Sequence, residues 1–158
     1  SHKGMAVRFN EQDVRSMGRT ASGVRGIRLA AADQVVGAVV IDSAESILVV
    51  TENGFGKRSA VEDYRITKRG GKGVFAIKTS ERNGNIVGAL LVTDEDEVML
   101  IADSGKIIRM NMKHNRVIGR NTQGVKLINL ESGEKVVAMD MVPDSYVDDE
   151  EGEDEEVS

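Results

Sequence analysis

The chain has 158 residues, with 21 basic and 26 acidic side chains, a formal net charge of −5, one proline and no cysteine. No apolar run approaches the roughly 20 residues of a membrane-spanning helix, and without cysteine there is neither a disulfide framework nor a cysteine-ligated zinc site, so we expect a cytoplasmic protein without membrane contact. The charge is uneven, because residues 140–158 hold ten acidic and no basic residues, whereas residues 1–139 hold all 21 basic residues and 16 acidic ones, a net charge of +5.

Short runs rich in Val, Ile and Leu predict β-strands along most of the chain. In chain order they are Val35–Ile41, Ile47–Thr51, Val74–Lys78, Ile86–Val92, Val98–Ala102, Ile107–Met110, Val125–Leu130 and Val136–Val142. Turn pairs such as Asn53-Gly54 separate them, and Asn-Gly permits the positive φ angles of tight hairpins. Ser59–Tyr64 is the one helix-like stretch. The sequence therefore predicts an all-β chain that ends in a disordered acidic tail, residues 143–158.

An internal repeat of about 50 residues organises these strands. Two glycine positions recur at spacings of 50 and 51 residues. The first series is Gly4, Gly54 and Gly105, and the second is Gly23, Gly73 and Gly124. Units of this length with about four short strands are typical of propeller blades. We therefore expect a pinwheel- or propeller-like array over residues 1–142, with units of approximately 1–45, 46–96 and 97–142. No strand precedes Gly4, so the first unit is incomplete, and open blade edges invite pairing with another chain, a homo-oligomer included.

The chain offers little for catalysis, metal binding or a cofactor. His2 and His114 have no third ligand at a recognisable metal spacing. The segment Gly54–Ser59 contains Gly-Lys but lacks the glycine spacing of a phosphate-binding P-loop. We expect neither catalytic residues nor a cofactor.

Basic residues recur in register between the first strand of each unit and its next glycine-led strand. Arginine forks and lysine ammonium groups bind phosphate, and the glycines around Lys72 let backbone N–H groups approach an anion. Aromatic residues make up only 3% of the chain, which disfavours single-strand binding by stacking and favours backbone binding of double-stranded DNA. The predicted DNA contacts are Arg15, Arg19, Arg25, Arg28, Lys57, Arg58, Lys68, Arg69, Lys72, Arg109, Lys113, Arg116, Arg120 and Lys126, and Arg65 falls in the same interval.

The acidic tail has two interpretations. It is either a solubilising segment or a tethered polyanion that competes with DNA for the basic residues, since a short tether gives a high effective concentration.

Five segments together carry a family likeness: Val7–Phe9, Met17–Thr20, Gly23–Leu29, Thr51–Arg58 and Val117–Val125. They resemble the C-terminal DNA-wrapping domain of gyrase A, a component of DNA gyrase, and the resemblance covers about residues 3–142. It implies a β-pinwheel whose blades exchange strands, of which this chain holds the last three. It also implies a non-catalytic module that wraps double-stranded DNA for an ATP-dependent type II topoisomerase. Its partners in negative supercoiling would be the rest of gyrase A and gyrase B.

The family's signature box has the form Gln-Arg-Arg-Gly-Gly-Lys-Gly. Thr67–Gly73 resembles it at five of seven positions and is interpreted as a degenerate copy, with the true box upstream. Two alternatives stay open: a repeat scaffold for acidic protein partners, and the equivalent domain of topoisomerase IV.

Overall fold

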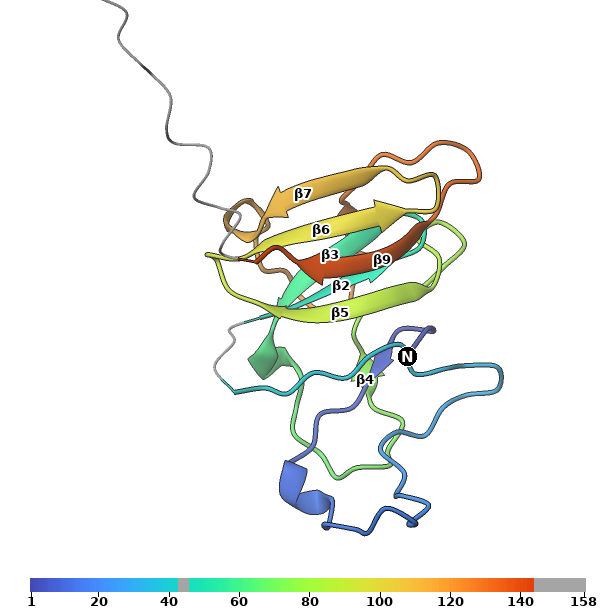
Figure 1. Cartoon of the computed structure of the whole chain (residues 1–158), viewed down its shortest axis with the longest axis vertical. Coiled ribbons are helices and arrows are strands. Elements are labelled where there is room, and N and C mark those ends of the chain that lie inside the picture. Colours follow the sequence, from blue (N-terminus) through green and yellow to red (C-terminus); the bar gives the residue numbers. More distant parts are fainter. Residues whose placement is uncertain (43–45, 144–158) are drawn as a thin grey trace, which may run out of the picture.

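The computed structural model describes residues 1–42 and 46–143 and confirms the all-β prediction, with short strands grouped into three antiparallel sheets. The first sheet pairs β1 (Met5–Ala6) with β4 (Val74–Phe75). The second has the order β5 (Ile86–Val92), β2 (Ser46–Thr51), β3 (Phe55–Ala60) and β8 (Val125–Lys126). The third has the order β7 (Ile107–Asn111), β6 (Glu97–Ala102) and β9 (Val136–Met141). The two larger sheets stack in the upper half of Figure 1, above β4 and the long loops of unit one.

A short 3₁₀ turn stands at the same place in each unit. These turns are η1 (Glu11–Asp13), η2 (Val61–Asp63) and η3 (Met112–His114). In η1 and η3 the preceding asparagine side chain accepts a backbone N–H of the turn, which is the usual role of Asn at this position. The spacing of the three turns repeats the spacing of the glycines, so the sequence repeat is also a structural repeat.

Blades exchange strands between consecutive units. β4 of unit two pairs with β1 of unit one, and β8 of unit three pairs with β3 of unit two. The two registers are the same in repeat numbering, because Ala6 lies opposite Val74 and Gly56 lies opposite Val125. β7 is the counterpart of β1 and β3 in unit three, and it forms an edge of its sheet.

The core lies on both faces of β2, all six residues of which are buried. Leu48 and Val50 pack with residues of the third sheet, whereas Ile47 and Val49 pack with η2 and with residues that follow β4. Each fully buried aliphatic side chain contributes about 1.5–3 kcal/mol by leaving water. The middle blade is therefore held from both sides by its neighbours.

The structure differs from several of the strand predictions. The predicted strand Val35–Ile41 is not formed. Its counterparts β5 and β9 pair with β2 and β6, and the described part of unit one contains no equivalent of β2 and β6. Conversely, the polar run Phe55–Ala60 forms strand β3, which pairs with β2, and the helix-like stretch Ser59–Tyr64 is the end of β3 followed by η2. The predicted strands at Val74–Lys78 and Val125–Leu130 shorten to two residues each.

Candidate nucleic-acid interface

The basic loops of the three units interlock in chain order. Gly71 accepts a 2.8 Å hydrogen bond from the Arg28 N–H, which ties the loop of unit two to that of unit one. Thr122 accepts an equivalent 2.8 Å bond from the Lys78 N–H, which ties unit three to unit two. The loops therefore form a continuous series rather than three separate projections.

The exposed cations of these loops form what we call the basic row. Arg15, Arg65 and Arg116 occupy one repeat position, and all three are exposed. The structure also exposes most of the other predicted contacts in or beside the same loops: Arg19, Arg25, Arg28, Lys68, Lys72, Lys113 and Lys126. These seven side chains, together with Arg15, Arg65 and Arg116, are the ten members of the basic row.

Arg69 and Arg120 are half-buried, and each uses some of its N–H donors for hydrogen bonds within the protein. Arg69 donates to the carbonyl oxygens of Asp13 and Arg25, at 2.9 and 3.1 Å. Arg120 donates to those of Asp63 and Phe75, at the same two distances. A guanidinium has five N–H donors, so both retain donors for an anion while they brace the preceding unit.

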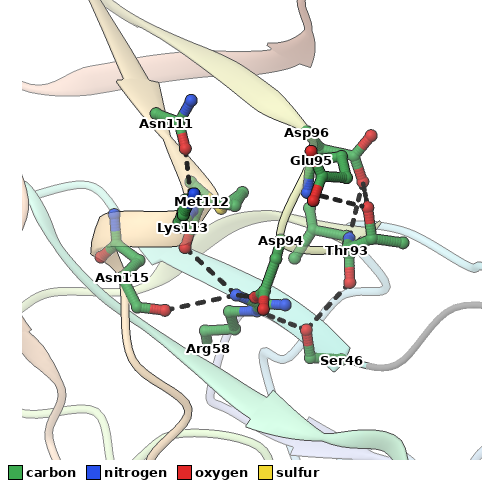
Figure 2. Close-up of polar contacts among 11 residues, drawn as sticks. Ser46, Arg58, Thr93, Asp94, Glu95, Asp96, Asn111, Met112, Lys113 and Asn115 are labelled. Atoms are coloured by element: carbon green, nitrogen blue, oxygen red, sulfur yellow. Dashed lines mark hydrogen bonds and ion pairs between the residues drawn. The ribbon is translucent and has the colours of Figure 1, made fainter.

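Arg58 does not belong to the interface, which corrects the expectation from sequence. Its side chain is only 3% exposed, and Figure 2 shows its guanidinium where β3 meets η3 and the Asp94 loop. Its Nη1 donates to Asp94 at 2.6 Å and to the carbonyl oxygens of Met112 and Asn115 at 3.1 and 3.4 Å. Arg58 thereby fastens unit three to unit two.

Arg8 makes the equivalent contact in unit one. Its Nη1 donates to the carbonyl oxygens of Val61 and Tyr64, at 3.0 and 3.1 Å. In units one and two, the arginine that follows the glycine-led turn thus holds the 3₁₀ turn of the next unit. In unit three this arginine is Arg109, which is exposed on β7 and forms an ion pair with Glu97 instead.

Lys57 is the second predicted contact that the structure places in the interior. It is 1% exposed, and its Nζ donates to the Gly119 carbonyl oxygen at 3.1 Å and to Thr122. Burial, together with the nearby Arg120 charge, lowers the pKa of Lys57 to about 8. Lys57 therefore supports the loop that carries Arg116 from beneath and presents no charge to a ligand.

Two cations beside the basic row, Arg82 and Lys78, were not among the DNA contacts predicted from the sequence. Arg82 lies 4.8 Å from the centre of the Phe55 ring, and Lys126 of the basic row lies 5.8 Å from the same ring. Arg82 is outside the repeated interval, so no spacing pointed to it. Lys78 was detectable, because its 50-residue separation from Arg28 was a usable signal.

Within the described ranges, no three acidic or histidine side chains gather to hold a metal ion. No helix in these ranges is long and apolar enough to cross a membrane.

The comparison with protein families decides the assignment. The sequence matches the family described as DNA gyrase C-terminal domain, beta-propeller, over residues 1–42, 45–93 and 96–143. The chain belongs to this gyrase family. The expected pinwheel and the family resemblance are thereby confirmed.

Similar proteins place the gyrase domain within longer chains. The gyrase A protein of Chlamydia pneumoniae is 49% identical over all of this chain, which covers 19% of that relative. The gyrase A protein of Klebsiella oxytoca is 50% identical over 96% of this chain and 17% of the relative. The chain thus spans less than a fifth of these curated relatives.

Solved structures agree on the fold. A DNA gyrase A C-terminal domain superposes with a TM-score of 0.81 at 29% identity, over 89% of this chain and 48% of the other. The C-terminal domain of a DNA topoisomerase IV gives 0.82 at 26% identity, over 89% and 44%. Shape alone does not separate the two enzymes, whereas the close sequence relatives bear the gyrase A name.

Proposed function

We propose that this gyrase domain binds double-stranded DNA through its phosphate backbone along the basic row. The observation that carries the proposal is the exposure of Arg15, Arg65 and Arg116 at one repeat position, on loops that are hydrogen-bonded to one another. Arginine presents a planar fork that matches two phosphate oxygens. A row of such forks follows the backbone of a duplex and does not depend on its sequence.

In the parent enzyme this binding serves DNA wrapping. The rest of gyrase A, together with gyrase B, would supply in the cytoplasm the ATP-driven strand passage that yields negative supercoils. The domain itself contributes neither a catalytic residue nor a cofactor.

The acidic tail has the charge to regulate the basic row. Residues 144–158 lie outside the described residues, so the proposal rests on their composition and on the tether at Pro143. A tethered polyanion competes with DNA at high effective concentration. Deleting residues 144–158 should tighten duplex binding, and the gain should shrink as salt screens both interactions. Unchanged affinity at low salt would leave the tail a solubilising segment.

Salt dependence of duplex binding tests the main proposal. Fluorescence anisotropy with a labelled duplex, on the tail-deleted chain, should give a slope of log K against log salt of about −0.9 per phosphate neutralised. Arg65→Gln and Arg116→Gln should each flatten that slope by about 1, for duplexes of unrelated sequence alike.

Lys135→Gln is the matched control, because it removes one charge at a site outside the basic row, beside Glu52. Equal effects of all three substitutions would show that only net charge matters and would overturn the assignment of the row. Salt-insensitive binding, or protein partners captured after nuclease treatment, would favour a protein scaffold.

A further inference from the structure

One repeat position of the basic row holds an aromatic ring instead of a cation. Two residues after each glycine of the second repeat series stand Arg25, Phe75 and Lys126. Arg25 and Lys126 are exposed members of the basic row. Phe75 is 44% exposed, and it is the one exposed phenylalanine or tyrosine among the described residues. In unit two an apolar ring therefore occupies the place at which the other two units present a charge.

The exposure of this position is a property of the blade. Lys126 lies on β8, the outer strand of a sheet with the order β5-β2-β3-β8, and it is exposed although all four strands are in place. Phe75 lies on β4, the counterpart of β8. A blade with its full set of strands therefore leaves this position open to a ligand.

Packing within the protein does not account for the placement of the ring. Phe75 lies opposite Met5 of β1, whereas Lys126 lies opposite Phe55 of β3. Phe55, on the strand nearer the core, is only 7% exposed. A ring that served the core alone would be better covered at Met5, the counterpart of Phe55. The sequence instead places the aromatic residue on the outer strand.

The backbone on both sides of the Phe75 side chain is fixed. The Ala76 N–H donates to the Gly4 carbonyl oxygen at 2.7 Å, and Arg120 Nη1 donates to the Phe75 carbonyl oxygen at 3.1 Å. Arg120 also holds the Asp63 carbonyl oxygen and retains N–H donors for a phosphate. The ring is thus pre-organised beside a guanidinium, and pre-organisation lowers the entropy lost on binding.

An apolar ring in a row of cations has a definite chemical use on duplex DNA. The cations bind phosphate oxygens, which a phenyl ring cannot do. Proteins that bend DNA insert Phe, Leu or Ile side chains from the minor groove between two base pairs and partly unstack them. Pyrimidine–purine steps unstack most readily.

We propose that Phe75 enters the minor groove of a duplex bound along the basic row and partly unstacks one base step, TA or CA in preference to others. This inference rests on the proposed function and adds to it an apolar contact that promotes bending. Covering the exposed part of the ring should tighten duplex binding about 3- to 10-fold, from the usual gain per area of apolar surface.

Affinity and salt slope together separate this contact from a phosphate contact. In the anisotropy assay with the full chain, Phe75→Ala should weaken duplex binding about 3- to 10-fold and leave the salt slope unchanged, because no charge is removed. The matched control is Val137→Ala, which truncates a valine 54% exposed on β9, a strand without any member of the basic row, and should change neither quantity. Unchanged affinity of Phe75→Ala, or an equal loss in the control, would overturn the proposal.

A fluorescent base reports the unstacking itself. In a duplex whose TA steps carry 2-aminopurine, saturating wild-type protein should raise the fluorescence, since an unstacked 2-aminopurine is less quenched. Saturating Phe75→Ala should not raise it, whereas Arg65→Gln, which loses a phosphate contact only, should. An equal rise with Phe75→Ala, or no rise with the wild type, is the result that excludes insertion of the ring.

Phe75→Lys guards against a trivial loss of folding, because lysine already occupies this position in unit three as Lys126. This variant should steepen the salt slope by about 1 and abolish the fluorescence rise. A retained rise would show that the ring is not the wedge. Steep salt dependence with Phe75 variants that behave as the wild type would overturn the wedge and leave the basic row intact. Salt-insensitive binding by the wild type would overturn the row and the wedge with it.

Discussion

One substitution made at three repeat positions tests whether these arginines serve the fold or a ligand. Replacing Arg58 with Met removes the charged donor from two carbonyl oxygens, and each loss costs about 1–3 kcal/mol. The Met112 carbonyl oxygen still accepts a hydrogen bond from the Asn115 N–H, so the cost of losing Arg58 there is near the lower limit of that range. Asp94 is 61% exposed, so water replaces its lost ion pair at little cost. We expect Arg58→Met to lower the free energy of unfolding by about 3 kcal/mol.

The same change should cost less at the other two positions. Arg8 binds the equivalent carbonyls but is half-buried, so water replaces part of what Arg8→Met removes, and we expect about 1–2 kcal/mol. Arg109 has only an exposed ion pair, and we expect Arg109→Met to cost less than about 1 kcal/mol.

Urea unfolding followed by circular dichroism, at protein concentrations where the chain is monomeric, measures the series. The reasoning fails if Arg109→Met costs as much as Arg58→Met. It also fails if Arg58→Met leaves stability intact while it flattens the salt slope of DNA binding, the outcome expected for a phosphate contact.

Three further predictions use the same unfolding assay. Gly73→Ala should cost at least about 1–3 kcal/mol more than Gly23→Ala: both have positive φ, but only the β-carbon at position 73 meets a backbone oxygen, 2.1 Å away at Ala6; equal losses would mean that this close approach does not limit the side chain at position 73. Leu48→Ala should cost about 2–5 kcal/mol, and a smaller loss would mean that the middle blade is not the core. Lys57 has a folded pKa of about 8, below its unfolded value of 10.5. The unfolded state therefore binds more protons between these values, and wild-type stability should rise relative to Lys57→Met by up to about 1.4 kcal/mol per pH unit there; parallel pH profiles would refute this.

Local sequence was sufficient for the strands whose residues carry their own signal. The Val- and Leu-rich run at β5 was predicted residue for residue. β3 could not be predicted in this way, because Lys57, Arg58 and Ser59 are polar and give no alternation. Lys57 and Arg58 are buried because unit three supplies carbonyl oxygens about 60 positions further along the chain. Such partners are invisible to any local pattern.

The site shows the same division. Exposure of Arg15 and Arg116 followed from their place in glycine-rich loops, where a long cation has no core to enter. Lys57 and Arg58 closely follow the turn glycine Gly54 and carry the same positive charge as the exposed arginines, so the sequence alone predicted them to be DNA contacts. The difference is geometric: β3 is a middle strand covered on both faces, and a cation there is retained only if backbone carbonyls replace water.

Recurrence of a basic residue therefore has two physical causes that a sequence does not separate. An arginine recurs when each unit must meet the same external anion, and it recurs equally when each unit must hold the next one. Arg15, Arg65 and Arg116 fit the first cause, since all three are exposed. Arg8 and Arg58 fit the second, since both end on carbonyls of the following unit. Arg109 distinguishes the two causes within one molecule, because it has the holding position, an exposed guanidinium and no following unit among the described residues. If Arg109→Gln flattens the salt slope of duplex binding by about 1, an external anion accounts for this arginine, and an unchanged slope would exclude that cause.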